Sequence, residues 1–202
     1  MKDLIILVAD VSMRSGIESL LNRKESFGIR QISYDIRVHP ERDPGIYKRS
    51  ADFLRIFLNQ YSYALVFLDQ EWNEDEIISS DKIICKIKDN LEKSGWIDRS
   101  EIIVFEPEFD IWVWAESPHT AKALGWDSYS ELSKWLISKG FWEEGTSKPI
   151  RPKEALEMVL KNTGIPLSSS IYENIASKVS LRKCEDASFR KFKEILQKWF
   201  PA

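Results

Sequence analysis

The chain has 202 residues, of which 43% are hydrophobic and 30% are charged, and this is enough for one substantial hydrophobic core. The net charge of −3 excludes a general attraction to nucleic acid or acidic membranes, so any such contact would need a local basic patch. Cys85 and Cys184 lie far apart without CxxC spacing, which argues against a disulfide scaffold or a structural zinc site and predicts a cytoplasmic protein.

Residues 4–9 form the first predicted element, an apolar run typical of a strand buried on both faces. The run is too short for a signal-peptide core or a membrane span, so no membrane association is expected. A helix follows and is expected to stop at Gly28, and the alternating segment 30–40 predicts a half-exposed or edge strand. The Asp-Pro-Gly sequence at 43–45 predicts a turn.

Strand and helix patterns continue to alternate up to about residue 106. The further expected elements are a helix at 46–61, a buried strand at 63–68, a helix at 75–96 and a buried strand at 101–106. This alternation, with its moderately short connections, predicts an α/β fold in which helices flank a mostly parallel sheet.

From residue 107 onward the sequence carries only helical patterns, separated by Gly, Pro and Ser. The predicted helices are 107–116, 119–125, 129–139, 152–162, 168–178 and 185–199. Six of the eight tryptophans lie in this half, and we expect them to pack small helices onto the sheet. The prediction is one domain, with an α/β core at 1–116 and a helical extension at 117–202.

Acidic residues follow each of the three predicted buried strands. They are Asp10 after the first strand, Asp69 and Glu71 after the second, and Glu106, Glu108 and Asp110 after the third. In a parallel sheet, ligands bind beyond the carboxyl ends of the strands. Because strand side chains alternate, Asp69 and Glu71 are expected to point the same way, and Asp10 joins them if its strand is a neighbour.

Gathering these carboxylates in one place costs free energy. Two carboxylates ~4 Å apart repel by about 4 kcal/mol at an effective dielectric constant near 20. A shared proton or a divalent cation relieves this repulsion, and oxygen ligands favour Mg²⁺ or Mn²⁺ over zinc. A bound pair of ions would activate water and stabilise an in-line phosphoryl displacement. The alternative for each acid is a helix N-cap or a solvated turn, and Asp10 in particular could cap the helix that follows it.

With these acids in place, the chain resembles the Toprim fold, the catalytic domain shared by topoisomerases, primases and the overcoming-lysogenization-defect nucleases. That family carries an acid, usually Glu, after its first strand and a DxD motif after a later one. The sequences "ILVAD" and "VFLDQE" are similar to these motifs through Asp10, Asp69 and Glu71.

More narrowly, the chain looks like the small Toprim-like proteins of bacterial defence systems, including the methylation-associated defence system. These proteins carry a segment of the type "PELEAWL", to which "PEFDIWVW" at 107–114 is similar. They also end in a pattern to which residues 172–200, "YENIASKVSLRKCEDASFRKFKEILQKWF", are similar. The resemblance therefore spans nearly the whole chain.

The resemblance implies a Toprim-like core that binds Mg²⁺ (or Mn²⁺) and acts as a nuclease-like component of an antiphage defence system, together with other defence proteins. It assigns catalysis and metal binding to Asp10, Asp69 and Glu71, while Glu108 or Asp110 would complete the metal shell. Two departures support an alternative, because the first acid is Asp and the second motif reads "DQE". That alternative is an inactive Toprim-like subunit that binds a protein partner or nucleic acid in a defence complex. A third hypothesis, a phospho-accepting Asp69 as in response regulators, lacks a convincing lysine after a later strand.

Basic residues would hold the backbone of a DNA or RNA substrate. The expected contacts are Arg14, Lys178, Arg182 and Lys183, of which the resemblance favours Lys178 and Arg182. Lys153 is a further basic residue of the helical half. The alternative for these residues is a solvated helix face. His39 ends the predicted edge strand, where it would act either as a general base or as a simple turn histidine.

Overall fold

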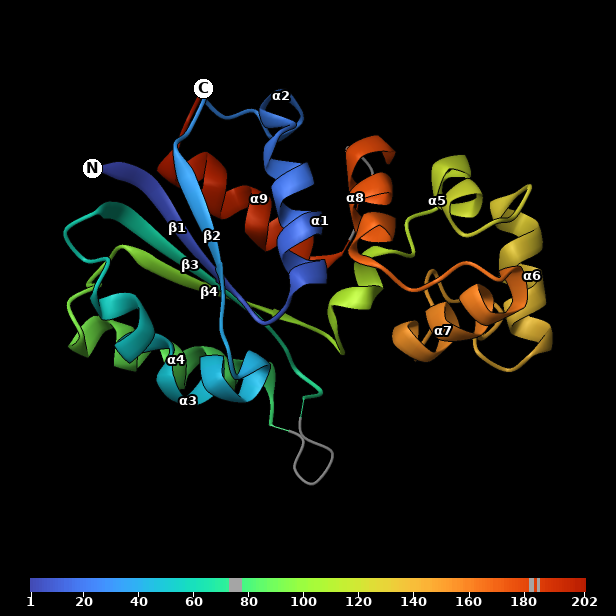
Figure 1. The fold of residues 1–202 in the computed structure, drawn as a ribbon, viewed down its shortest axis with the longest axis horizontal. Coiled ribbons are helices and arrows are strands. Elements are labelled where there is room, and N and C mark those ends of the chain that lie inside the picture. Colours follow the sequence, from blue (N-terminus) through green and yellow to red (C-terminus); the bar gives the residue numbers. More distant parts are fainter. Residues whose placement is uncertain (73–77, 182–183, 185) are drawn as a thin grey trace.

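A sheet of four parallel strands lies at the centre of the computed structural model, which describes residues 1–72, 78–181, 184 and 186–202 (Figure 1). The strands are β1 (Lys2–Val8), β2 (Tyr34–Val38), β3 (Tyr61–Asp69) and β4 (Ser100–Phe105). Their order is β2-β1-β3-β4, and Ile6 of β1 pairs with Ile36 on one side and with Leu65 on the other. The predicted α/β fold with a parallel sheet is confirmed.

Helices cover both faces of this sheet and make up the second half of the chain. They are α1 (Val11–Leu21), α2 (Lys24–Phe27), α3 (Arg42–Arg55), α4 (Ser80–Lys93), α5 (Pro118–Ala123), α6 (Tyr129–Ser138), α7 (Pro152–Thr163), α8 (Ser169–Lys178) and α9 (Ala187–Trp199). Helices α1 and α9 lie on one face of the sheet, and α3 and α4 lie on the other (Figure 1). None of the helices in the described residues is both long and apolar enough to cross a membrane.

The order of the strands creates a crevice at the carboxyl ends of β1 and β3. From β1 the chain passes through α1 to β2 on one side, whereas α3 carries it back across the other face to β3 on the opposite side. The connections therefore diverge between β1 and β3, and ligands of parallel α/β proteins bind at such a switch point.

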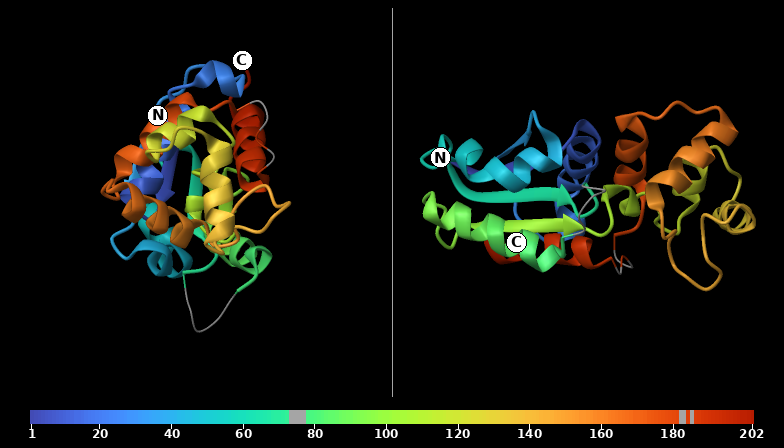
Figure 2. Two further views of the ribbon diagram at one scale, coloured as in Figure 1. Left: turned by 90° about the vertical axis from the view of Figure 1, so that its right-hand side faces the viewer. Right: turned by 90° about the horizontal axis from the view of Figure 1, so that it is seen from below.

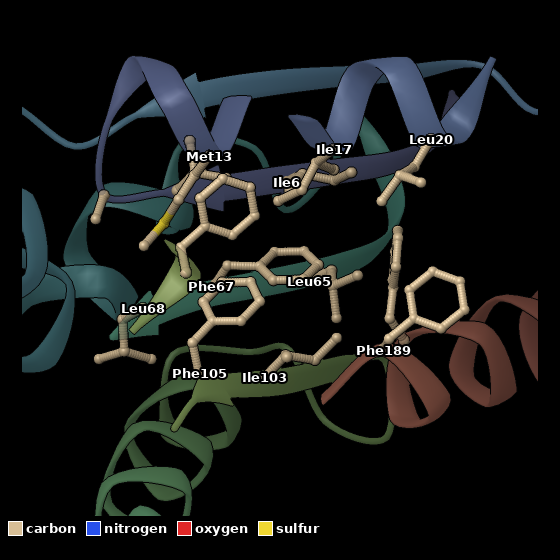
Figure 3. Close-up of a cluster of buried hydrophobic side chains, with 14 of the residues drawn as sticks. Ile6, Met13, Ile17, Leu20, Leu65, Phe67, Leu68, Ile103, Phe105 and Phe189 are labelled. Carbon is tan, nitrogen blue, oxygen red and sulfur yellow. The ribbon is translucent and has the colours of Figure 1, made fainter. Parts of the chain in front are cut away.

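An aromatic layer joins α9 to the sheet. The rings of Phe67 and Phe105 stack with centroids 5.7 Å apart, and Phe192 of α9 meets Phe67 edge-on at 5.2 Å. Figure 3 shows Phe67 and Phe105 in this layer, with Ile17 of α1 beside Ile6 of β1. The end of the helical half thus contributes to the same core as residues 1–116.

Helices α5, α6 and α7 gather beyond the carboxyl ends of the strands (Figure 2). Tryptophans hold this region together: the rings of Trp114 and Trp142 meet edge-on at 5.7 Å, and those of Trp126 and Trp135 lie 5.2 Å apart. The helical character predicted for the second half is confirmed, and of these three helices α7 lines the crevice described above, through Lys153, Leu156 and Glu157.

Two local predictions are wrong. Residues 43–45 lie in the first turn of α3 rather than in a separate turn, because a proline in the first helical turn removes no hydrogen bond that the helix needs. The segment predicted as a helix at 107–116 contains only a short 3-10 helix, η1 (Phe109–Trp112). Of the helix predicted at 75–96, residues 75–77 lie outside the described residues, and α4 covers Ser80–Lys93.

Gly16 of α1 permits the close approach of η1 and α8. A Cβ atom at this position would lie 2.7 Å from Cζ of Phe109 and 3.7 Å from Cβ of Tyr172. We expect Gly16→Ala to lower the free energy of unfolding by about 1–2 kcal/mol, because the clash outweighs the ~1 kcal/mol gain in helix propensity. Urea unfolding measures this effect, with Ser15→Ala on the same helix as the control. A Gly16→Ala variant at least as stable as the wild type would contradict the packing described.

Candidate functional site

A cavity of about 530 Å³ opens at the switch point of the sheet. It is lined by Ala9, Asp10, Val11, Ser12, Val38, His39, Pro40, Arg42, Asp69, Glu108, Asp110, Lys153, Leu156, Glu157, Leu167 and Tyr172. These residues come from the ends of β1, β2 and β3, from the segment after β4, and from helices α1, α3, α7 and α8 with their flanking loops. Asp10, Asp69, Glu108 and Asp110, the acids at or after the ends of β1, β3 and β4, all line this cavity.

Asp10 serves both the helix and the cavity. It is the N-cap of α1, and its Oδ1 accepts a hydrogen bond of 2.8 Å from the backbone N–H of Met13. The capping alternative is thus confirmed, yet the same side chain also lines the cavity. Because β1 and β3 are neighbours, Asp10 stands at the strand end adjacent to that of Asp69.

Asp69 ends β3 and fixes the segment that follows β4. Its Oδ1 accepts a 2.8 Å hydrogen bond from the backbone N–H of Phe109. Burial raises the pKa of Asp69 well above its usual value, and the negative charges of Asp43, Asp110 and Glu108 add to this effect. A carboxyl group held in this way is costly to ionise without a nearby positive charge.

Asp43 is an acid of the site that the sequence analysis missed. Its Oδ1 accepts a 2.9 Å hydrogen bond from the backbone N–H of Asp69, so that the first turn of α3 is joined to the end of β3. Burial and the charge of Asp10 raise the pKa of Asp43. The signal in the sequence was an acid directly before Pro44, since this pattern also begins a helix.

Glu108 and Asp110 enter the cavity from the segment after β4. Oε1 of Glu108 accepts a 3.0 Å hydrogen bond from the backbone N–H of Lys153, and burial with the charge of Asp110 raises the pKa of Glu108 to about 7. Oδ1 of Asp110 accepts a 2.6 Å hydrogen bond from the Tyr172 hydroxyl. Burial raises the pKa of Asp110 despite this hydrogen bond. We call Asp10, Asp43, Asp69, Glu108 and Asp110 the acidic cluster.

Glu71 is not brought into the cavity. It is exposed and does not line the cavity, although Asp69 does. Strand β3 ends at Asp69, and the backbone N–H groups of Gln70 and Glu71 both donate to the carbonyl of Pro107. The chain bends at this point, so the strand alternation that would align Glu71 with Asp69 does not continue.

The predicted phosphate contacts are not at the cavity either, so far as the structure describes them. Arg14 is exposed on α1, 4.0 Å from Glu18, and Lys178 is exposed at the end of α8. Neither residue lines the cavity. Arg182 and Lys183 lie outside the described residues. The basic residues that do line it are Arg42 and Lys153.

His39 follows β2 and is almost completely buried, with 4% of its surface exposed. Its Nδ1 accepts a 3.1 Å hydrogen bond from the backbone N–H of Glu41, which places the proton of the neutral ring on Nε2. Burial, aided by the charge of Arg49, lowers the pKa of His39 and favours this neutral form. His39 is therefore a buried, neutral side chain held by a backbone hydrogen bond and not a solvated turn residue.

Comparisons with known proteins add no relative. The chain matches no protein-family model, no curated protein and no solved structure. The site is therefore interpreted from its own residues.

The acidic cluster has the donor chemistry of a site for a hard divalent cation, because its ligands are carboxylate oxygens. Asp10, Asp69 and Glu108 each use one oxygen for a hydrogen bond from the backbone, and the second oxygen has no hydrogen-bond partner among the described residues. Within the same residues, no three His, Cys, Asp or Glu side chains already stand close enough together to hold an ion. The chemistry of the cluster thus fits Mg²⁺ or Mn²⁺, while binding would have to draw the free oxygens together.

Proposed function

We propose that the chain is a divalent-metal-dependent phosphodiester hydrolase that works as a nuclease-like component of a bacterial antiphage defence system. The observation that carries this proposal is the acidic cluster at the switch point. Carboxyl groups from separate segments meet there, and the pKa values of Asp43, Asp69, Glu108 and Asp110 are raised by burial and by the charges of neighbouring carboxylates. The defence setting is supported by the Toprim-like resemblance of the sequence alone.

Each group of the cavity has a role in this chemistry. Asp10, Asp69 and Asp110 would hold Mg²⁺ or Mn²⁺, which when bound supplies an activated water and stabilises charge on the phosphoryl group. Glu108, with a pKa of about 7, is suited to take up and return a proton near neutral pH. Lys153 lies beside Glu108 and Asp110, where its charge opposes the rise in their pKa values.

Asp10→Asn tests this function without removing the helix cap, because Asn caps helices as well as Asp does. We expect the variant to cleave DNA, RNA and a small chromogenic phosphodiester at least about tenfold more slowly than the wild type in Mn²⁺. The control is Asp52→Asn, which removes an exposed carboxylate on α3. Equal rates for Asp10→Asn and the control, or no Mn²⁺ binding and no cleavage by the wild type, would contradict the proposal.

A second candidate is a catalytically inactive Toprim-like subunit that binds a protein partner or nucleic acid in a defence complex. It is supported by the absence of a ready three-ligand group among the described residues and by the structural duties of Asp10 and Asp69. In this case Asp10→Asn would leave defence against phage intact, whereas Lys178→Glu would abolish it. Lys161→Glu, an equal charge reversal at an exposed position of α7, is the matched control.

A further inference from the structure

His39 is held so firmly that only one of its ring nitrogens is free for a ligand. The Nδ1–Cε1 edge faces Gly45, where an added Cβ would lie 2.2 Å from Nδ1, and the ring packs against Phe53 at 5.2 Å between centroids. Nδ1 is already bonded to the backbone N–H of Glu41. Nε2 has no hydrogen-bond partner among the described residues, and His39 lines the cavity. A neutral ring fixed in this way keeps its Nε2–H as a donor for a ligand.

Two cations stand at the same cavity. Lys153 begins the first turn of α7 with its side chain exposed, and Arg42 begins α3. Arg42 has a φ of 50°, a left-handed conformation that is uncommon outside glycine and costs backbone strain. Its backbone N–H also donates to the carbonyl of His39, so Arg42 and His39 are fixed relative to one another. Together with His39, these residues offer N–H donors suited to the oxygens of a phosphate.

Part of the cavity is lined by apolar side chains. Val11 and Leu167 belong to the few large hydrophobic residues that remain exposed, at 58% and 55%, and both line the cavity. Leu156 and Pro40 line it as well. Exposed apolar side chains beside a polar site favour a ligand that itself combines an apolar or planar part with a charged part.

We infer that this cavity binds a nucleoside phosphate, with His39, Arg42 and Lys153 on the phosphate and Val11 and Leu167 against the base. The inference rests on the proposed function, because the phosphate would meet the acidic cluster through the divalent cation. A volume of about 530 Å³ suits a small ligand, for which cavities of roughly 300–1,000 Å³ are typical.

Adenosine 5′-monophosphate tests the inference by isothermal titration calorimetry in the presence of Mn²⁺. We expect Lys153→Gln to weaken binding at least about tenfold, the effect of losing one charge-assisted hydrogen bond. Lys161→Gln on the same helix is the control and should bind as the wild type does. His39→Gln keeps a side-chain N–H and is expected to bind more tightly than His39→Ala. Inorganic phosphate should bind more weakly than the nucleotide. Leu167→Ser should reduce this difference in affinity, because it removes an apolar contact to the base.

Mn²⁺ binding without nucleotide, followed by electron paramagnetic resonance, separates this inference from the proposed function. If Mn²⁺ does not bind the wild type, both the proposed function and the inference are overturned. If Mn²⁺ binds but the nucleotide binds no better than inorganic phosphate, the inference alone is overturned. It is also overturned if Lys153→Gln and Lys161→Gln bind the nucleotide equally well.

Discussion

Asp69→Asn is expected to stabilise the metal-free protein at neutral pH and to abolish its binding of Mn²⁺. The Asn side chain keeps an oxygen that can accept the hydrogen bond from Phe109, but it removes a charge that burial and Asp43 make costly. Removing this cost should raise the free energy of unfolding by about 1–3 kcal/mol. Functional residues at binding sites commonly lower the stability of the folded protein.

Thermal unfolding with and without Mn²⁺ measures both effects in one experiment. A cation that binds only the folded state raises the melting temperature of the wild type, and this rise should vanish in Asp69→Asn. Asp52→Asn should match the wild type in both conditions, because Asp52 is exposed and outside the acidic cluster. A metal-free Asp69→Asn protein that is less stable than the wild type would contradict the expected stabilisation, and an undiminished rise in its melting temperature with Mn²⁺ would contradict a role of Asp69 in metal binding.

Glu108 is expected to make the stability of the metal-free protein fall as the pH rises from about 5 to about 8. Burial and the charge of Asp110 raise the pKa of Glu108 from 4.5 to about 7, so the folded state holds a proton that the unfolded state has released. The stabilisation from this proton is complete below the pKa that Glu108 has in the unfolded chain. It is lost as the pH rises through the pKa that Glu108 has in the folded protein. Because Glu108 is only partly buried and solvent screens its charge, the loss amounts to about 1–2 kcal/mol.

Urea unfolding at a series of pH values tests this dependence. Glu108→Gln should flatten the pH profile, and Glu194→Gln at an exposed position of α9 should leave it unchanged. The charged groups that face Glu108 are Asp110, Lys153 and Glu154. The pKa values of Asp43, Asp69 and Asp110 are also raised, so the stability of Glu108→Gln should still fall somewhat as the pH rises. Superimposable profiles for Glu108→Gln and the wild type would refute this assignment.

The strand ends could be predicted from the sequence because each buried strand is a short apolar run that an acid terminates. Asp10, Asp69, Glu108 and Asp110 all follow or end such strands, and all four line the cavity. Parallel strands place their carboxyl ends together, and this general rule is sufficient to predict that these acids lie near one another.

The remaining members of the site depend on bends and packing that local patterns do not encode. The sequence predicts Asp43 as a turn residue, because Asp-Pro-Gly is as typical of turns as of helix starts. The alignment of Glu71 with Asp69 requires that the strand pleat continues, whereas the chain turns there toward Pro107. Lys153 and Arg42 reach the cavity only through the placement of α7 and α3, for which the sequence carries no periodic signal.

The position of α9 on the sheet has a consequence for synthesis on the ribosome. Phe67 and Tyr63 of β3 are covered by Phe192 and Trp199, which emerge more than a hundred residues later in translation. Until then the growing polypeptide presents an aromatic surface to water, and exposed surfaces of this kind invite aggregation or capture by chaperones. A nascent polypeptide stalled before residue 187 should therefore be retained by chaperones, and this face of the sheet should be covered only once α9 has been synthesised.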